Sequence, residues 1–184
     1  PIVSWSLMRA NLFPEHAVLL VDIGSEITEV TFLVDGVIVE VMSLPFGVLN
    51  VLLRVAESEH VEVENALSLL TAYTGGSLSP DAEARIRAII KKEAKSWEEV
   101  FERVWQRASR DMMLNIKMYF LGGGAMINDM KNVIVPPLLH PDLAKGLDVV
   151  TISPDAFRDK FGAYSGLDGP GDFGLMALIL NVQT

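Results

Sequence analysis

A strand, an acidic turn and a tight hairpin follow one another between Leu19 and Gly47. The apolar run Leu19–Val21 leads directly into Asp22-Ile23-Gly24-Ser25, and Asp35-Gly36 separates two further strand-like segments. An Asp-Gly pair suits a two-residue hairpin turn, because glycine adopts positive φ without steric cost. We therefore expect an antiparallel meander of three strands, over residues 17–23, 27–34 and 37–43.

The carboxylate of Asp22 falls at the end of the first expected strand, beside a glycine. A carboxylate in this place could orient a metal-bound water near a phosphate. An ordinary β-turn with a solvated aspartate explains the same residues, and short motifs often match by chance. Motifs elsewhere in the chain are needed to distinguish these two interpretations.

The middle of the chain predicts helices. We expect helices over residues 48–57 and 62–73, the second ended by Gly75-Gly76. Ser79 suits the N-cap of a third helix, and Pro80 its first position. Apolar residues then recur at spacings of three and four, which predicts one buried stripe on a helix of ~40 Å. The stripe comprises Ile86, Ile89, Ile90, Trp97, Val100, Phe101, Val104, Trp105 and Ala108.

A second glycine turn follows the next expected strand, residues 115–121. Gly122-Gly123-Gly124 comes directly after it, and we expect a helix to begin there that carries Met126 and Ile127 and ends before Pro136. Glycines let a backbone approach a ligand closely, and free N–H groups at a helix start favour phosphate. A tight strand-to-helix turn is the simpler alternative. A strand over 147–152, a loop over 161–171 and a helix over 173–182 complete the expected order.

Composition narrows the function classes. The chain has 184 residues, no cysteine and a net charge of −9, which excludes disulfides and thiolate metal sites and argues against nucleic-acid partners. No apolar run is long enough to span a bilayer, and no signal peptide is visible. The first residue is Pro1 and not Met, so we expect a fragment whose residues 1–16 are the tail of a preceding element. Nine of the 15 basic residues lie between Arg85 and Lys117, which we interpret as the solvated face of the long helix, with a binding patch as the alternative.

The two glycine turns together resemble the actin-like ATPase superfamily. Val21–Glu29 followed by a hairpin looks like the second phosphate motif of that superfamily, and Phe120–Ala125 looks like its adenosine motif. Leu44-Pro45-Phe46-Gly47 and Val61–Leu67 are similar to bacterial FtsA-type cell-division and PilM-type pilus-assembly proteins. The resemblance runs from about Ala17 to the C-terminus.

This resemblance implies an α/β fold, with an RNase H-like (actin-like ATPase) mixed sheet, flanking helices and a small helical insert. Residues 17–47 and 108–184 would form the core, and residues 48–107 the insert subdomain with the long helix. ATP and Mg²⁺ are the implied cofactors, with Asp22 holding Mg²⁺ through water. The implied phosphate-binding residues are Asp22, Gly24, Ser25 and Thr28. The implied adenosine-binding residues are Gly122, Gly123, Gly124, Ala125, Asn65 and Ser68, the last two where the family often has Glu and Lys.

The sequence also departs from the family pattern. Ser25-Glu26-Ile27 is bulkier than the usual small residues and adds a carboxylate, which disfavours phosphate nearby. We therefore expect at most a weak ATPase in the full-length protein and none in the fragment alone, because the first phosphate motif belongs to the other half of such a fold.

Three functions stay open after this comparison. The first is a nucleotide-binding or nucleotide-degenerate scaffold that assembles with itself or with membrane-attached division or pilus proteins, in the cytoplasm or peripherally at the inner membrane. The second is a kinase of the sugar or acetate kinase branch, and the third is a purely structural domain with a vestigial cleft.

Overall fold

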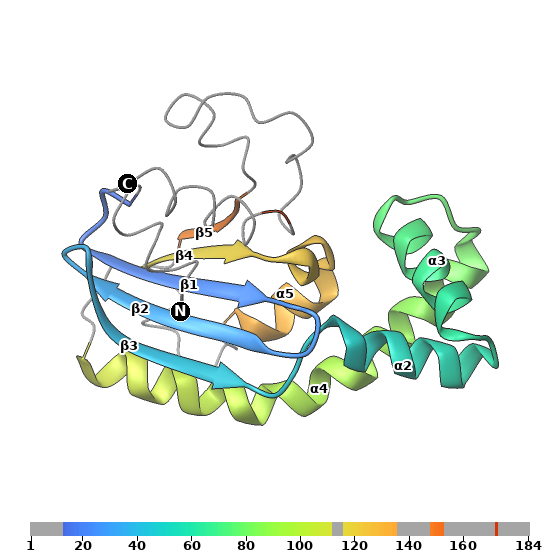
Figure 1. The fold of residues 1–184 in the computed structure, drawn as a ribbon, viewed down its shortest axis with the longest axis horizontal. Coiled ribbons are helices and arrows are strands. Elements are labelled where there is room, and N and C mark those ends of the chain that lie inside the picture. Colours follow the sequence, from blue (N-terminus) through green and yellow to red (C-terminus); the bar gives the residue numbers. More distant parts are fainter. Residues whose placement is uncertain (1–12, 112–115, 136–147, 153–171, 173–184) are drawn as a thin grey trace.

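The structure, a computed structural model, describes residues 13–111, 116–135, 148–152 and 172 of the chain. Its described part consists of a five-stranded sheet, helices packed against the sheet, and a helical insert beside it (Figure 1). The helices and strands follow the order β1(Ala17–Ile23), β2(Thr28–Val34), β3(Val37–Leu44), α2(Val48–Glu59), α3(Val63–Thr74), α4(Pro80–Asp111), β4(Ile116–Leu121), η1(Gly123–Met126), α5(Asn128–Ile134) and β5(Asp148–Thr151).

The sheet is mixed, with strand order β3-β2-β1-β4-β5. The first three strands form the expected antiparallel meander, and β4 and β5 lie parallel to β1 and β4 respectively. Asp35 and Gly36 both adopt positive φ in the turn between β2 and β3. Because β1 and β4 are parallel neighbours, their carboxyl ends lie at the same edge of the sheet, in front of the two glycine turns. This arrangement confirms the predicted α/β mixed sheet with flanking helices.

The core lies between one face of the sheet and α4 with α5. Apolar side chains of alternating positions in β1, such as Leu19 and Val21, join one buried cluster with Trp97 and Phe101 of α4. The indole of Trp97 is fully buried, and its ring centroid lies 5.5 Å from that of Phe46, in the segment that leaves β3. The predicted apolar stripe of α4 is therefore confirmed for the positions whose side chains are described.

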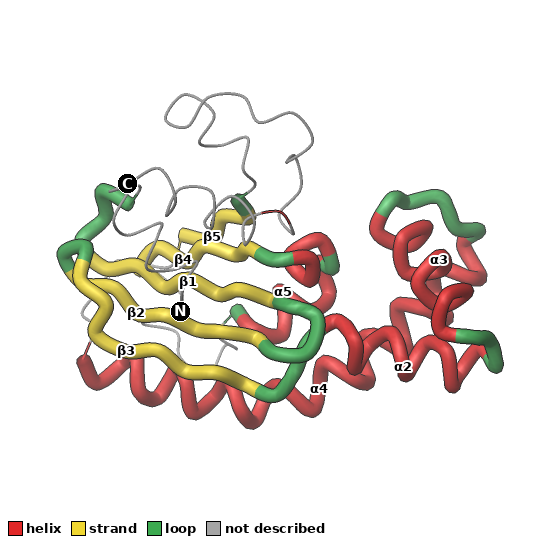
Figure 2. The backbone as a smooth tube through the Cα atoms, viewed as in Figure 1, coloured by secondary structure: helices red, strands yellow, loops and turns green. Residues whose placement is uncertain are grey.

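The long helix joins the insert to the sheet. Its first turns pack with α2 and α3, and it then runs beneath the sheet to meet α5 (Figures 1 and 2). Ser79 caps it as predicted: its carbonyl accepts from the N–H of Glu83 at 2.8 Å, and its hydroxyl accepts from the N–H of Ala82 at 3.4 Å. The 32 residues of α4 correspond to ~48 Å at 1.5 Å per residue, so one rigid rod spans both parts.

The segment after β4 differs from the prediction of one continuous helix. Gly123–Met126 forms a short 3-10 turn, Ile127 is extended with φ −92° and ψ 95°, and only then does α5 begin. Met126 and Ile127 therefore do not lie in the helix where the sequence placed them. The reason is that glycine gives little support to an α-helix, so the chain turns tightly here before regular geometry starts.

Two other expectations fall outside the described residues, namely the loop over 161–171 and the terminal helix over 173–182. Within the described residues, no helix combines the length and the apolar character needed to cross a membrane.

Truncation of Trp97 tests the packing of α4 against the sheet. We expect Trp97→Ala to lower the free energy of unfolding by about 3–5 kcal/mol, because it removes a large, fully buried side chain and leaves a cavity. The control is Lys92→Ala on an exposed position of the same helix, which should change it by less than about 0.5 kcal/mol. Chemical denaturation measures both, and similar values for the two variants would contradict this packing.

Candidate functional site

The two glycine turns singled out in the sequence meet in the structure. Asp22 pairs with Leu121 in the parallel ladder, so the turns that follow the two residues are neighbours at one edge of the sheet. A Cβ placed on Gly122 would lie within 3.0 Å of Asp22 Oδ1, the Ile23 carbonyl oxygen and the Ile23 carbonyl carbon. Asp22 and Gly122, which are 100 positions apart in the sequence, are thus in van der Waals contact.

Only glycine fits position 122. Its backbone adopts φ 83° and ψ 166°, a combination that is essentially limited to glycine. Gly124 is restricted by space, because a Cβ there would overlap the side chain of Ile23. Gly123 is different, since a Cβ there would meet nothing within 4 Å. The turn therefore has two glycines fixed by packing and one that leaves open space at the edge of the sheet.

The Asp22 carboxyl group lies next to a second acidic residue. Asp22 is directly opposite Glu29 in the antiparallel ladder, and Glu29 is only 8% exposed. Burial, with a further contribution from the negative charge of Glu29, raises the pKa of Asp22 to about 6. Glu29 is not among the site residues that the sequence motifs predict. Counting back from the turn at Gly24–Ile27 would have placed it opposite Asp22.

The turn after β1 also anchors the insert. The carbonyl oxygens of Gly24 and Ser25 accept the N–H groups of Val48 and Leu49 at 3.0 and 2.8 Å. These are the first two residues of α2, whose N–H groups have no partner within the helix. Gly47 packs so tightly against Ser25 that a Cβ there would overlap the Ser25 backbone. The predicted phosphate turn and the start of the insert therefore form one rigid unit.

Of the four predicted phosphate-binding residues, two already have partners within the chain. The hydroxyl of Thr28 is buried and donates to the Phe46 carbonyl oxygen at 2.9 Å, and the N–H of Gly24 donates to the Ile27 carbonyl oxygen at 2.9 Å. Ser25 is exposed, as are its neighbours Glu26 and Ile27. Asp22 and Ser25 therefore remain as the side chains that can face a ligand here.

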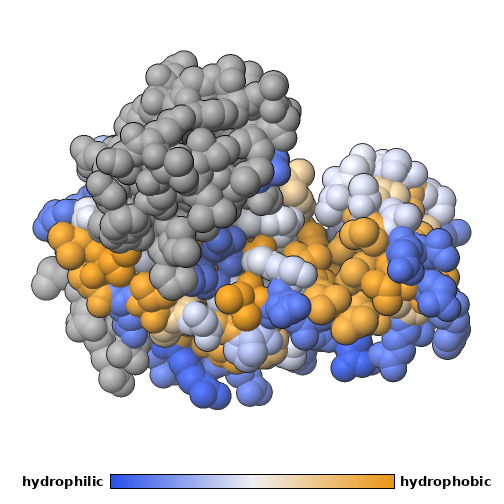
Figure 3. Space-filling view, viewed as in Figure 1, coloured by the Kyte–Doolittle hydropathy of each residue, from blue (hydrophilic) through white to orange (hydrophobic). Residues whose placement is uncertain are grey.

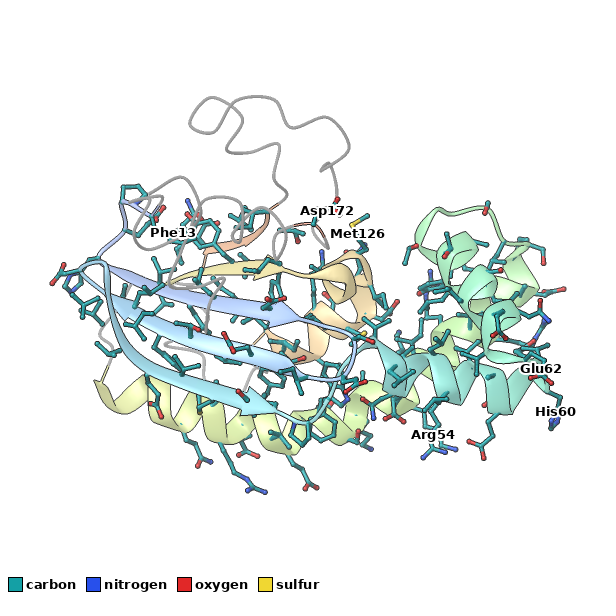
Figure 4. The ribbon with its side chains drawn as sticks, viewed as in Figure 1. Phe13, Arg54, His60, Glu62, Met126 and Asp172 are labelled. Atoms are coloured by element: carbon teal, nitrogen blue, oxygen red, sulfur yellow. The ribbon has the colours of Figure 1, made fainter. Side chains whose placement is uncertain are left out.

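The predicted adenosine side is made of backbone. Gly124 and Ala125 are buried, Gly123 is exposed, and the Met126 side chain is about half exposed at the end of the turn. In Figure 4, Met126 projects from this turn toward the side of the molecule that carries the insert. Backbone free of side chains is what close approach of a flat ligand requires.

The insert contributes Asn65 and Ser68, both exposed on α3. The Ser68 hydroxyl donates to the Glu64 carbonyl oxygen at 3.1 Å within the helix. One contact fixes α3 relative to α5: the hydroxyl of Tyr73 donates to a carboxylate oxygen of Asp129. Arg87 Nε donates in turn to the Tyr73 hydroxyl at 3.3 Å. This contact has no local sequence signal, because its partners lie far apart in the chain.

The residues at this edge of the sheet fit part of a nucleotide and Mg²⁺ site. Carboxylate oxygens such as those of Asp22 and Glu29 are ligands that Mg²⁺ accepts, directly or through water. The open space at Gly123 suits a ligand that approaches the backbone. Neither glycine turn offers a lysine or arginine side chain for a phosphate group. A complete site would need positive charge from elsewhere.

Comparison with known proteins shows the fold. No protein-family profile and no curated protein matches the chain. Among solved structures, a chain of the PilM–PilN type IV pilus biogenesis complex has a TM-score of 0.67 and 20% identity, over 98% of this chain and 51% of that chain. An archaeal actin homologue has a TM-score of 0.55 and 15% identity, over 100% of this chain and 53% of that chain. The activator of the 2-hydroxyisocaproyl-CoA dehydratase of Clostridium difficile, with bound ADPNP, has a TM-score of 0.53 and 12% identity. The match covers 98% of this chain and 65% of that chain.

The described structure thus has the fold of the actin-like ATPase superfamily, as the two motifs predicted. The chain spans about half the length of the PilM and archaeal actin chains that it matches. At 12–20% identity these likenesses establish the fold, and they leave the residues of the site to be argued from their own geometry.

Exchanging single glycines tests the contact between the two turns. We expect Gly122→Ala to lower the free energy of unfolding by about 2–5 kcal/mol, because the new methyl group combines forbidden backbone angles with overlap against Asp22 and Ile23. Gly123→Ala is the matched control and should change it by less than about 1 kcal/mol, since its Cβ meets open space. Equal effects in a denaturation experiment would contradict the described packing.

The raised pKa of Asp22 predicts a pH dependence of stability. Between its ordinary pKa of 3.8 and the folded value of about 6, the folded protein holds a proton that the unfolded chain has released. The contribution of Asp22 to stability therefore falls as pH rises through this window. We expect Asp22→Asn to stabilise the protein at pH 7.5 by up to about 3 kcal/mol, because one pKa unit is worth about 1.4 kcal/mol.

Glu99→Gln is the control for that change, because Glu99 is exposed on α4 and no ion pair or side-chain hydrogen bond within the described residues engages it. The measurement is thermal or urea unfolding at pH 4 and at pH 7.5. A loss of stability in Asp22→Asn at pH 7.5, relative to this control, would show that the Asp22 carboxylate is not held at a cost.

Proposed function

We propose that this chain forms half of a nucleotide cleft in an actin-like scaffold protein that works by assembly, with weak hydrolysis or none. The observation that carries the proposal is the meeting of Asp22 with Gly122 at one edge of the sheet. The phosphates and Mg²⁺ would lie on the side of Asp22, Glu29 and Ser25. The adenosine would lie against the backbone of Gly122–Ala125, with the exposed Asn65 and Ser68 of α3 toward its ribose and base.

The charges at this edge of the sheet suggest which groups would bind the phosphates. Two carboxylates face the phosphate side, and Glu26 adds a third acidic residue in the exposed turn. Like charge weakens phosphate binding unless a cation intervenes. Mg²⁺ would supply that positive charge when bound, and the remaining donors would come from a first phosphate motif outside this chain.

The proposed cellular role is assembly beside membrane-attached partners, in pilus biogenesis or in cell division. It is supported by the likeness in fold, over 98% of this chain, to a chain of the PilM–PilN type IV pilus biogenesis complex. In that role the protein would lie in the cytoplasm, at the inner membrane through its partners. A kinase of the same superfamily would need a catalytic aspartate and a substrate pocket from the other half.

A structural domain without nucleotide is a second candidate, and specific contacts favour it. The Thr28 hydroxyl and the Gly24 N–H are both engaged within the chain, and the carbonyls of Gly24 and Ser25 hold the start of α2. The turn therefore has a structural role, because it attaches the insert to the sheet, and this role needs no ligand. Calorimetry separates the two candidates.

The test titrates the full-length protein with ATP, with and without Mg²⁺, by isothermal titration calorimetry. We expect measurable binding that Mg²⁺ strengthens, and a loss of about tenfold or more in Asp22→Asn, because the carboxylate that orients the metal is gone. Asp35→Asn, the same chemical change far from the cleft, should bind as the wild type does. Absence of binding in the wild type would leave the structural domain as the function, and hydrolysis that appears only with an added sugar or acid would favour the kinase.

A further inference from the structure

A groove borders the part of α4 that lies beside α5. This groove, with a volume of about 540 Å³, runs between α4 and α5. The α5 side offers Asn132 and Val133, and Val135 follows the helix. The α4 side offers five charged residues, namely Lys91, Lys95, Glu98, Glu99 and Glu102. Four of them, Lys91, Lys95, Glu98 and Glu102, follow one another at intervals of four, three and four residues, and Glu99 lies beside this line.

The charges on this stripe are segregated by sign. The spacing of four, three and four residues puts the four side chains within an arc of about 60° on the helix, so they form one line. The two lysines occupy its N-terminal half and the two glutamates its C-terminal half. Figure 3 shows hydrophilic residues along the lower edge of the molecule, where α4 runs in Figure 1.

Other charged residues near the stripe form ion pairs within the chain, whereas the charged residues of the stripe do not. Arg54 pairs with Glu57 and Glu93, and Arg85 pairs with Glu59. By contrast, no ion pair or side-chain hydrogen bond engages Lys91, Lys95 or Glu98 anywhere in the described part of the chain. Glu102 accepts only a long bond of 3.4 Å from Gln106. The stripe is therefore a set of unmatched charges beside a groove.

We propose that this stripe is the contact surface for a second copy of the chain, with the two α4 helices antiparallel. A two-fold axis between positions 96 and 97 puts Lys91 opposite Glu102 of the partner subunit and Lys95 opposite Glu98 of the partner subunit. The symmetry repeats both pairs, which gives four ion pairs in a closed dimer.

A second copy fits this stripe better than an unrelated acidic or basic partner. A uniformly charged partner would match one half of the stripe and repel the other, whereas an antiparallel copy matches both halves at the same register. The four-three-four spacing is also that of the contact seam in paired helices. The next positions along the same line, toward the N-terminus of α4, are Ala88 and Ala84, both small and exposed. Val133 and Val135 supply apolar surface at the groove.

The energetics make this a weak and salt-sensitive contact. Exposed ion pairs contribute little each, and salt screens them. The chain also carries a net charge of −9, so two copies repel one another except where positive charge is concentrated. The lysine half of the stripe provides that concentration. The proposal rests only on the assembly part of the proposed function, and it holds whether or not the protein binds nucleotide.

Charge reversal in two variants tests the proposal. In the first, Lys91→Glu with Lys95→Glu makes the stripe fully acidic. In the second, Glu98→Lys with Glu102→Lys makes it fully basic. Sedimentation velocity of the full-length protein, at concentrations up to about 1 mM, should show a wild-type dimer that each variant weakens by about tenfold or more. An equal mixture of the two variants should restore the dimer, because all four positions then face opposite charge.

The matched control is Lys92→Glu with Arg103→Glu, the same change of net charge at exposed positions outside the stripe. It should dimerise nearly as the wild type does. Circular dichroism checks that every variant remains folded. A wild type that stays monomeric, or a mixture that fails to associate while its components are folded, overturns the proposal. Association that both reversed variants retain would place the dimer contact elsewhere and overturns it equally.

Discussion

Contact between the ends of β1 and β4 is the constraint on which the rest of the structure depends. Gly122 lies against Asp22 and Ile23 with no room for a Cβ, and this closeness sets how the two parallel strands finish. From the first of them, the carbonyls of Gly24 and Ser25 hold the start of α2 and so the insert. From the second, the turn leads through η1 to α5, which packs on α4. One point of close packing thus links the sheet, the insert and the helical layer.

The same point carries an unfavourable charge. Asp22 and Glu29 lie opposite one another at the sheet edge, and burial there raises the pKa of Asp22. A neutral residue would be more stable in this place, so the structure gives no packing reason for the carboxylate. Groups held at a cost to stability tend to mark functional sites, and a divalent cation would relieve the repulsion between these two. This unfavourable charge is the physical reason for proposing that a ligand binds at this edge of the sheet.

Much of this fold could be predicted from the sequence, because its signals are local. Apolar, strand-like runs and an Asp-Gly pair predicted the meander, and Ser79-Pro80 predicted the start of α4. The segment after Gly122 was predicted wrongly, since glycine leaves the choice between a 3-10 turn and an α-helix to packing against Ile23. The contact of Tyr73 with Asp129 could not be predicted, because it depends on how α3 and α5 come together in space. The motifs indicated the candidate site, and only the register revealed Glu29 beside Asp22.

If the two glycine turns face one bound nucleotide, a metal ion bound with that nucleotide lies near both turns. Nuclear magnetic resonance of the full-length protein with ATP and Mn²⁺ in place of Mg²⁺ tests this expectation most directly, because the paramagnetic ion broadens the signals of nearby amides. We expect selective broadening of the amide signals of Ser25 and Gly123, with those of Gly36 and Gly76 unchanged. Uniform or absent broadening, or broadening confined to one of the two turns, would contradict it.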